Sequence, residues 1–137
     1  MKWKKLERTI YPCTVYFCQG GTASEVKAKM KRLGLIPDEE EKQRGQQLGF
    51  TLKMTDKNDR LSVLIWVKSA KRNPRDVSIL GHECEHATYA IFQHIGLEGA
   101  VLYDDQEVHA YLIGYLLEEA LEFFWQKPRF DVSFGFE

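Results

Sequence analysis

The chain has only three cysteines, Cys13, Cys18 and Cys84, and their spacing matches neither a disulfide framework nor a cysteine-based metal site. It also lacks any apolar run of the roughly 18–20 residues that a membrane-spanning helix needs. The N-terminal stretch begins with positive charges, but Pro12 and several polar residues interrupt the continuous apolar centre that a signal peptide requires. We therefore expect a reduced, cytoplasmic protein with no membrane partner.

An excess of charge of one sign is absent as well. The 19 Lys and Arg residues balance 20 Asp and Glu residues, for a net charge of -1, and this balance gives no support to a nucleic-acid partner. Two local basic clusters nevertheless stand out, at Lys2, Lys4, Lys5 and Arg8 and at Lys27, Lys29, Lys31 and Arg32. Such clusters are usually solvated faces. The alternative, binding to nucleic acid, predicts an interaction that salt weakens and that survives chelation of metal.

No internal repeat or low-complexity linker divides the chain. With 137 residues, of which 44% are hydrophobic, it is long enough for one folded core and too short for a second. We expect a single domain over residues 1–137, with an extended tail at 128–137.

Local signals define most of the expected elements. Thr22 and Glu25 form a capping box at the start of a helix that Gly34 ends, and Asn73 caps a longer helix that Gly96 ends. The expected order is a strand over 9–18, a helix from about 23 to 33, a loop or short exposed helix over 38–48, a hairpin of strands at 49–55 and 60–69, a helix from 74 to about 95, and a helix from about 105 to 126. This order predicts an α+β domain with a small, mostly antiparallel sheet packed against its helices.

Within the helix that Asn73 caps, residues 82–86 read H-E-C-E-H. His82 and His86 are four residues apart, so they share one helix face and can both bind one tetrahedral zinc ion. Glu83 projects beside them, where a carboxylate can take a proton from a zinc-bound water as it attacks a carbonyl carbon. The alternative is a pair of histidines on an amphipathic helix, one exposed and one hydrogen-bonded in the core.

A catalytic zinc ion needs a third protein ligand. The downstream candidates are His94, Asp104, Asp105, Glu107 and His109. His94 lies about 12 Å from His86 along the helix axis, too far to share the metal. Glu107 and His109 lie about 200° apart on the last helix, so they cannot both be ligands. We favour Glu107, because Ala110 and Gly114 continue its row and would let this helix approach the zinc helix closely.

On these residues the chain resembles the gluzincin class of zinc metallopeptidases, and in its compact order of elements the minigluzincins and the small metallopeptidase-like proteins carried by phages. The resemblance implies a minimal zincin-like domain, Zn²⁺ as cofactor, His82, His86 and Glu107 as metal ligands, and Glu83 as the general base. The position four residues after Glu107, which is acidic in larger gluzincins, is Tyr111 here.

The expected function is therefore zinc-dependent hydrolysis of a peptide or protein substrate, with Glu83 activating the water. The alternative is a zinc-stabilised binding or inhibitory module with little or no peptidase turnover. Tyr103, His109 and Tyr111 are candidates to stabilise an oxyanion, and Cys84 is expected to pack inward. The tail alternates Phe130, Val132, Phe134 and Phe136 with other residues. It either covers an edge or surface of the domain or lies in the cleft and blocks it.

Overall fold

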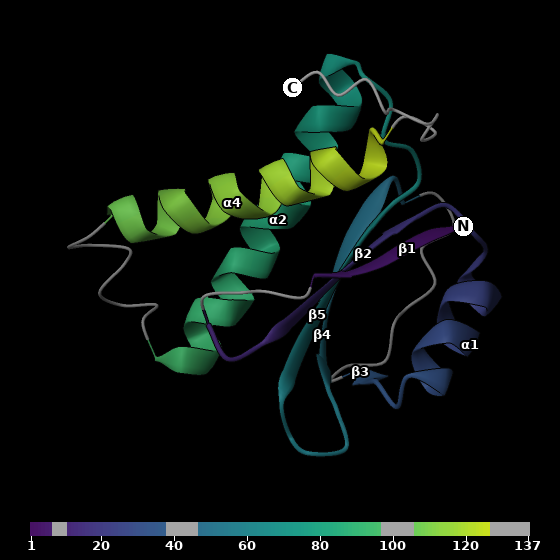
Figure 1. Ribbon diagram of the computed structural model, residues 1–137, viewed down its shortest axis with the longest axis vertical. Coiled ribbons are helices and arrows are strands. Elements are labelled where there is room, and N and C mark those ends of the chain that lie inside the picture. The colour runs from purple at the N-terminus through teal and green to yellow at the C-terminus, as the bar shows by residue number, and fades with distance from the viewer. Residues whose placement is uncertain (7–10, 38–46, 97–105, 127–137) are drawn as a thin grey trace, which may run out of the picture.

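The structure, a computed structural model, describes residues 1–6, 11–37, 47–96 and 106–126. Within these ranges a five-stranded mixed sheet carries helices on both faces, which makes the domain α+β as the sequence predicted (Figure 1). The strands are β1 (Lys2–Leu6), β2 (Thr14–Gln19), β3 (Ile36–Pro37), β4 (Gly49–Thr55) and β5 (Leu61–Val67), and the helices are α1 (Ala23–Arg32), α2 (Pro74–Ile95) and α4 (Gln106–Phe124).

The sheet has the strand order β1-β2-β5-β4-β3. Its neighbours pair antiparallel except for β2 and β5, which are parallel, so the expected mostly antiparallel sheet is confirmed. The expected hairpin is also present, because β4 pairs with β5 from Gly49–Val67 to Thr55–Leu61. Two strands were not predicted: the basic segment that forms β1 and the two-residue β3.

Alternation along the central strands divides the core between the two faces of the sheet. In β2, Phe17 points toward α2 and α4 while Tyr16 points toward α1, and in β5 the buried Ile65 and Leu64 divide in the same way. Successive side chains of a strand point to opposite faces, and β5 has a covered face on either side. This explains why β5 is apolar through its middle and does not alternate with polar residues.

The caps read from the sequence are confirmed. Thr22 Oγ1 accepts a hydrogen bond from the backbone N–H of Glu25, and the Glu25 carboxylate accepts one from the backbone N–H of Thr22, both at 3.2 Å. The Asn73 side chain accepts from the Asp76 backbone N–H at 2.9 Å. Gly96 ends α2 at φ 77°, a left-handed conformation that costs glycine little because it has no Cβ.

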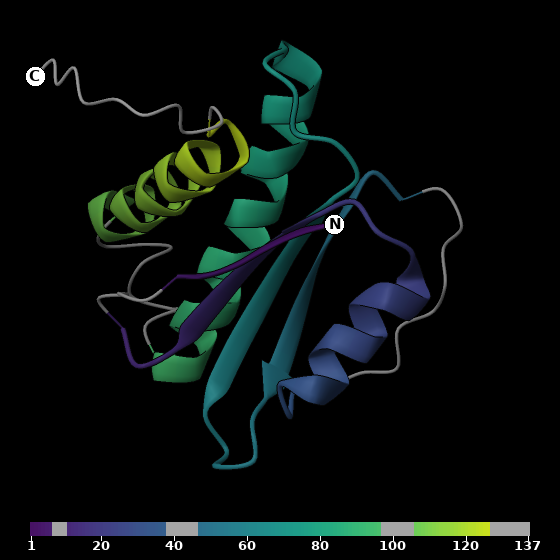
Figure 2. The same cartoon turned by 45° about the vertical axis from the view of Figure 1, so that its right-hand side comes forward.

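Helix α4 crosses α2 on one face of the sheet, and α1 covers the opposite face (Figure 2). The row of α4 that packs inward is Leu112, Leu116, Ala120 and Phe124, each four residues from the next and each buried. Phe124 meets Phe17 of β2 edge to face, with ring centroids 6.2 Å apart. This row sets the rotation of α4 about its own axis, and that rotation determines which of its polar side chains can reach α2.

Several expectations fall outside the described residues. They include most of the loop or short helix expected at 38–48, the residues Tyr103, Asp104 and Asp105, and the whole of the tail at 128–137. None of the helices in the described ranges is both long and apolar enough to cross a membrane.

Candidate functional site

The structure brings His82 and His86 together on the exposed face of α2. Their Nε2 atoms are 3.1 Å apart, and the two rings meet edge to face with centroids 4.7 Å apart. Two imidazole nitrogens bound to one tetrahedral zinc ion, each at about 2.0–2.1 Å, would be separated by about 3.3 Å. The pair therefore has the spacing of two adjacent corners of a zinc tetrahedron. A hydrogen bond in which one imidazole donates to the other has a similar length.

Glu83 is buried, with 6% of its surface exposed. Its side chain extends from α2 toward β4. The hydroxyl of Thr51 on β4 lies 2.9 Å from Glu83 Oε1 and 3.0 Å from its backbone carbonyl oxygen. Since a hydroxyl has one proton and the carboxylate is an acceptor, the Thr51 hydroxyl can donate to Oε1 and hold that oxygen in place.

Gly49, two residues before Thr51 on the same strand face, leaves room for the Glu83 side chain. A Cβ at position 49 would lie 3.1 Å from Glu83 Cγ, 3.2 Å from its Oε2 and 3.0 Å from Ile79 Cγ2. These separations are shorter than ordinary van der Waals contact, so any larger residue would push the carboxylate or Ile79 aside. β4 thus contributes a space and a hydrogen-bond donor to Glu83, neither of which was predicted from the sequence.

A second unpredicted contact joins α4 to α2. His109 Nε2 lies 2.9 and 3.0 Å from the two carboxylate oxygens of Glu85, and the His109 ring packs 5.7 Å from the ring of Phe92. The His109 side chain is only 19% exposed. His109 is therefore largely buried against α2, whereas the Glu85 side chain is 50% exposed. The sequence held one indication of this contact: His109 precedes the apolar Leu112 by three residues, so the two side chains share one side of the helix.

The close approach expected along the row of Glu107 is not found. Glu107, Ala110 and Gly114 are all exposed, and the inward row of α4 consists of the larger apolar residues described above. Because His109 faces α2 and Glu107 lies about 200° away around the helix, the Glu107 carboxylate does not join the histidine pair. Across the described ranges, His, Cys, Asp and Glu side chains do not gather in any group of three or more that could hold a metal ion.

The remaining candidates are separated from the pair in different ways. Tyr111 is 74% exposed on α4, and His94 is exposed in the last turn of α2. Cys84 is fully buried, as predicted, and burial raises the pKa of its thiol to about 12. A protonated thiol facing the core is a packing group and not a metal ligand.

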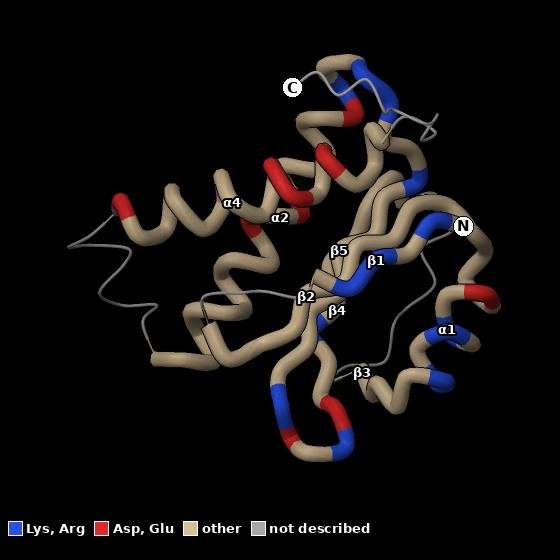
Figure 3. Tube along the Cα trace, viewed as in Figure 1, with Lys and Arg blue, Asp and Glu red and all other residues tan. Residues whose placement is uncertain are grey.

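Charge is distributed unevenly around this site. Figure 3 shows Lys and Arg along β1 and α1, whereas α4 carries Glu and no Lys or Arg. β1 nevertheless lies beside the end of α4, where Lys2 Nζ donates to the Phe124 carbonyl at 3.4 Å and Lys4 Nζ lies 5.7 Å from the Phe123 ring centroid. The two basic segments, far apart in the sequence, touch at one place, where Lys29 Nζ of α1 lies 5.8 Å from the ring centroid of Trp3 of β1.

Comparison with known proteins places the chain in no family, since no family model, no curated protein and no solved structure matches it.

Proposed function

We propose that this protein is a zinc-dependent hydrolase of the metallopeptidase type, with His82 and His86 as two of its metal ligands. The observation that carries the proposal is the 3.1 Å separation of the two Nε2 atoms on an exposed helix face. The buried carboxylate of Glu83, one residue along, supports it. A zinc ion held there would act as a Lewis acid that polarises a carbonyl group and lowers the pKa of water.

Three residues of the chain would transfer the proton or position the group that does so. Glu83 accepts a proton from water at its carboxylate and returns it to the leaving amine, as a general base and then a general acid. Thr51 donates to Oε1 and leaves Oε2 as the oxygen with free acceptor capacity. Gly49 keeps the space in which that carboxylate sits. An accurately held base is what efficient proton transfer needs.

Glu107 and His109 are the two candidates for the third ligand. The resemblance to gluzincins favours Glu107, whereas the rotation of α4 turns His109 toward α2. Binding through Glu107 requires α4 to rotate or shift, whereas binding through His109 requires its imidazole to leave Glu85. The choice is therefore open to a direct measurement of metal content.

The test is the zinc content of the purified full-length chain after dialysis, measured by elemental analysis. We expect one zinc ion per chain in the native protein and in His94→Ala, a matched control that removes an exposed histidine from the same helix. His86→Ala should lose the metal, and whichever of Glu107→Ala and His109→Ala loses it identifies the third ligand. A native chain without zinc, or full occupancy in His86→Ala, contradicts the proposal.

Activity is tested separately with a fluorogenic peptide library. Replacing a general base typically costs about 10²–10⁴-fold in rate, so Glu83→Gln should lose turnover while it keeps its zinc. A native chain that binds one zinc ion but cleaves nothing would instead support the zinc-stabilised binding module.

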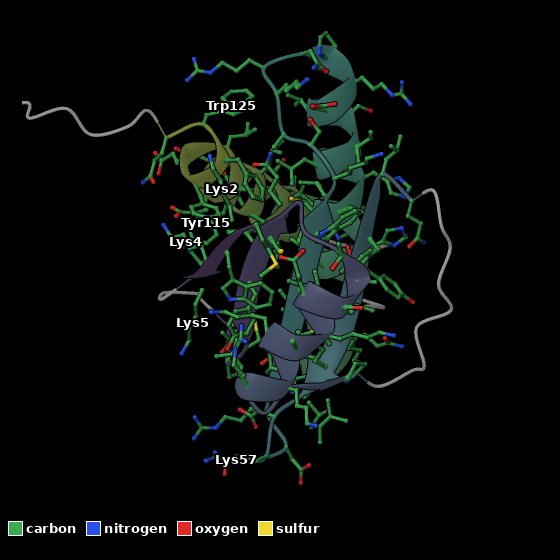
Figure 4. All side chains as sticks on the ribbon, turned by 90° about the vertical axis from the view of Figure 1, so that its right-hand side faces the viewer. Lys2, Lys4, Lys5, Lys57, Tyr115 and Trp125 are labelled. Carbon is green, nitrogen blue, oxygen red and sulfur yellow. The ribbon has the colours of Figure 1, made fainter. Side chains whose placement is uncertain are left out.

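One observation favours a second candidate function, the binding of a polyanion such as nucleic acid. The basic residues gather on β1 and α1: Figure 4 shows Lys2, Lys4 and Lys5 along one edge of the molecule, and Lys29 of α1 lies 5.8 Å from the ring centroid of Trp3 of β1. Within the described part of the chain, none of the Lys and Arg side chains of these two elements pairs with a carboxylate. Binding at this face should weaken steeply with salt and persist in a chelator, which distinguishes it from any function of the histidine pair.

A further inference from the structure

The outward side of α4 carries an open groove of about 510 Å³ with an apolar floor. The floor consists of Gly114, Leu117, Leu121 and Trp125. These residues follow one another at intervals of three or four positions, so they form a stripe along the helix. The buried row of α4 that packs inward lies on a different side. A helix with apolar side chains on a second side offers more apolar surface than its own core covers, which is typical of a binding surface.

One end of this groove is held in place by contacts within the fold. The indole N–H of Trp125 donates to the backbone carbonyl of Ala70 at 2.8 Å. The Arg72 guanidinium lies over the Trp125 ring, 5.1 Å from its centroid, and donates to the Trp125 carbonyl at 3.3 Å. A wall that is already ordered lowers the entropic cost of binding a partner. At the other end the space is open, because a Cβ at Gly114 would meet nothing within 4 Å.

Carboxylates line the groove beside its apolar floor. Glu118 and Glu122 both contribute to the lining, and both are exposed. They are four residues apart, so they stand on one side of the helix about one turn from each other. Within the described part of the chain, neither carboxylate pairs with a Lys, Arg or His side chain. Arg72, the basic residue of the lining, lies over Trp125 at the closed end. The groove is thus apolar along its floor and negative along one rim.

These charges select the class of partner. A nucleic acid or an anionic membrane would be repelled by the two carboxylates. Two copies of α4 packed against each other would bring like charges together, because the sequence of α4 contains Glu but no Lys or Arg. A protein segment that carries Lys or Arg beside its apolar side chains would instead pair with the carboxylates.

The surface of a helix also favours a helical partner over an extended one. The backbone N–H and C=O groups of α4 are hydrogen-bonded within the helix, so they cannot pair with an added strand. An amphipathic helix needs no such pairing, since it presents apolar side chains at i, i+3, i+4 and i+7 to a groove. From Gly114 to Trp125 the axis of α4 rises by about 17 Å at about 1.5 Å per residue, which matches about three turns of such a helix.

We propose that this groove binds an amphipathic helix of a partner protein. The apolar stripe of the partner lies on the two leucines and Trp125, and its Lys or Arg side chains pair with Glu118 and Glu122. The histidine pair of α2 does not line the groove, so this binding is independent of any metal at that pair.

Nuclear magnetic resonance of the full-length, ¹⁵N-labelled chain tests the proposal at the groove itself. The chain has three tryptophans, and Trp125→Phe identifies the indole N–H signal of Trp125. The probe is an amphipathic peptide of leucine and lysine with about 14 residues, which spans about 21 Å as a helix. The control peptide has glutamate in place of every lysine. We expect the lysine peptide to shift the Trp125 signal with an affinity at least about tenfold higher than that of the glutamate peptide. Trp3 and Trp66 pack on the α1 face of the sheet, so their signals should stay in place.

A charge variant separates the rim of the groove from non-specific attraction. Glu118→Gln combined with Glu122→Gln removes both rim charges and should weaken binding of the lysine peptide about fivefold to tenfold. The matched control is Glu119→Gln combined with Asp59→Asn. It changes the net charge equally at residues that do not line the groove, and it should keep the native affinity.

A steric variant tests the open end. Gly114→Gln extends a side chain into that space without a clash inside the fold and should weaken binding about tenfold. Its matched control is Ser78→Gln, at an exposed position of α2 outside the groove, which should bind as the native chain does. Circular dichroism establishes that every variant is folded.

Any of four results would overturn the proposal. The first is a lysine peptide that leaves the Trp125 signal in place, and the second is a shift confined to Trp3 or Trp66. The third is equal affinity in a groove variant and its matched control. The fourth is a Trp125 shift that appears as protein concentration rises without peptide, which makes a second copy the occupant.

Discussion

Replacement of Thr51 by valine tests whether β4 holds the Glu83 carboxylate. Valine has nearly the shape of threonine but lacks the hydroxyl that lies 2.9 Å from Glu83 Oε1. Glu83 is only 6% exposed, so water can replace that donor poorly. Loss of a hydrogen bond to a buried charged acceptor typically costs about 1.5–3 kcal/mol, whereas the difference in strand propensity between the two residues is below about 1 kcal/mol. We therefore expect the free energy of unfolding to fall by about 2 kcal/mol.

Urea denaturation measures this change as a lower midpoint with an unchanged m-value. In a thermal scan it corresponds to a midpoint lower by about 6–10 °C for a domain of this size. Thr51→Ser, which keeps the hydroxyl, should lose less than about 1 kcal/mol. In a Glu83→Leu background the same Thr51→Val change should cost less, about 1 kcal/mol, because the carboxylate is gone and only the backbone carbonyl of residue 83 remains as an acceptor. A native-like stability of Thr51→Val, within about 0.5 kcal/mol, would refute the idea that this hydroxyl holds the carboxylate.

Two further predictions concern ionisable groups. Hydrogen bonds from the Lys71 backbone N–H and the Ser69 hydroxyl hold the pKa of Asp76 below its usual value. A lowered folded-state pKa stabilises the fold above the unfolded value of about 4, and that stabilisation is lost as the pH falls through the folded pKa. The difference in urea midpoint between the native chain and Asp76→Asn should thus be present at neutral pH and shrink in acid, and a difference that grows in acid would contradict this. Burial raises the pKa of Cys18 to about 11 and that of Cys84 to about 12, so iodoacetamide at pH 8 should modify only the partly exposed Cys13 in the folded chain and all three cysteines in urea, as counted by mass spectrometry.

Features that depend on a few neighbouring residues could be predicted from the sequence. The capping box of Thr22 and Glu25 is formed within four residues, and the Asn73 cap reaches Asp76 within the same distance. The facing of His82 and His86 follows from their spacing of four residues on a helix with about 3.6 residues per turn. Each of these is a local interaction whose geometry the helix itself imposes.

β1 shows why other elements could not be predicted. Its sequence, KWKKL, has neither the apolar run nor the regular alternation that marks a strand. It is a strand because β2 offers a free edge, with which it pairs from Lys2–Gln19 to Leu6–Val15. The parallel pairing of β2 with β5 is of the same kind, since it joins residues about fifty positions apart through hydrogen bonds that no local pattern encodes.

In the candidate site, too, local features could be predicted from the sequence and long-range contacts could not. The sequence by itself determined that α2 exists, where it starts and ends, that His82 and His86 share a face, and that Cys84 turns inward. Only the tertiary structure decided what surrounds Glu83, because Thr51 and Gly49 come from a strand more than thirty residues earlier.

It also decided that His109 and not Glu107 faces α2. The rotation of α4 is set by which of its rows buries the most apolar surface, and the row of Leu112, Leu116, Ala120 and Phe124 buries more than that of Ala110 and Gly114. That comparison depends on the shape of the sheet and of α2, which no residue of α4 specifies alone.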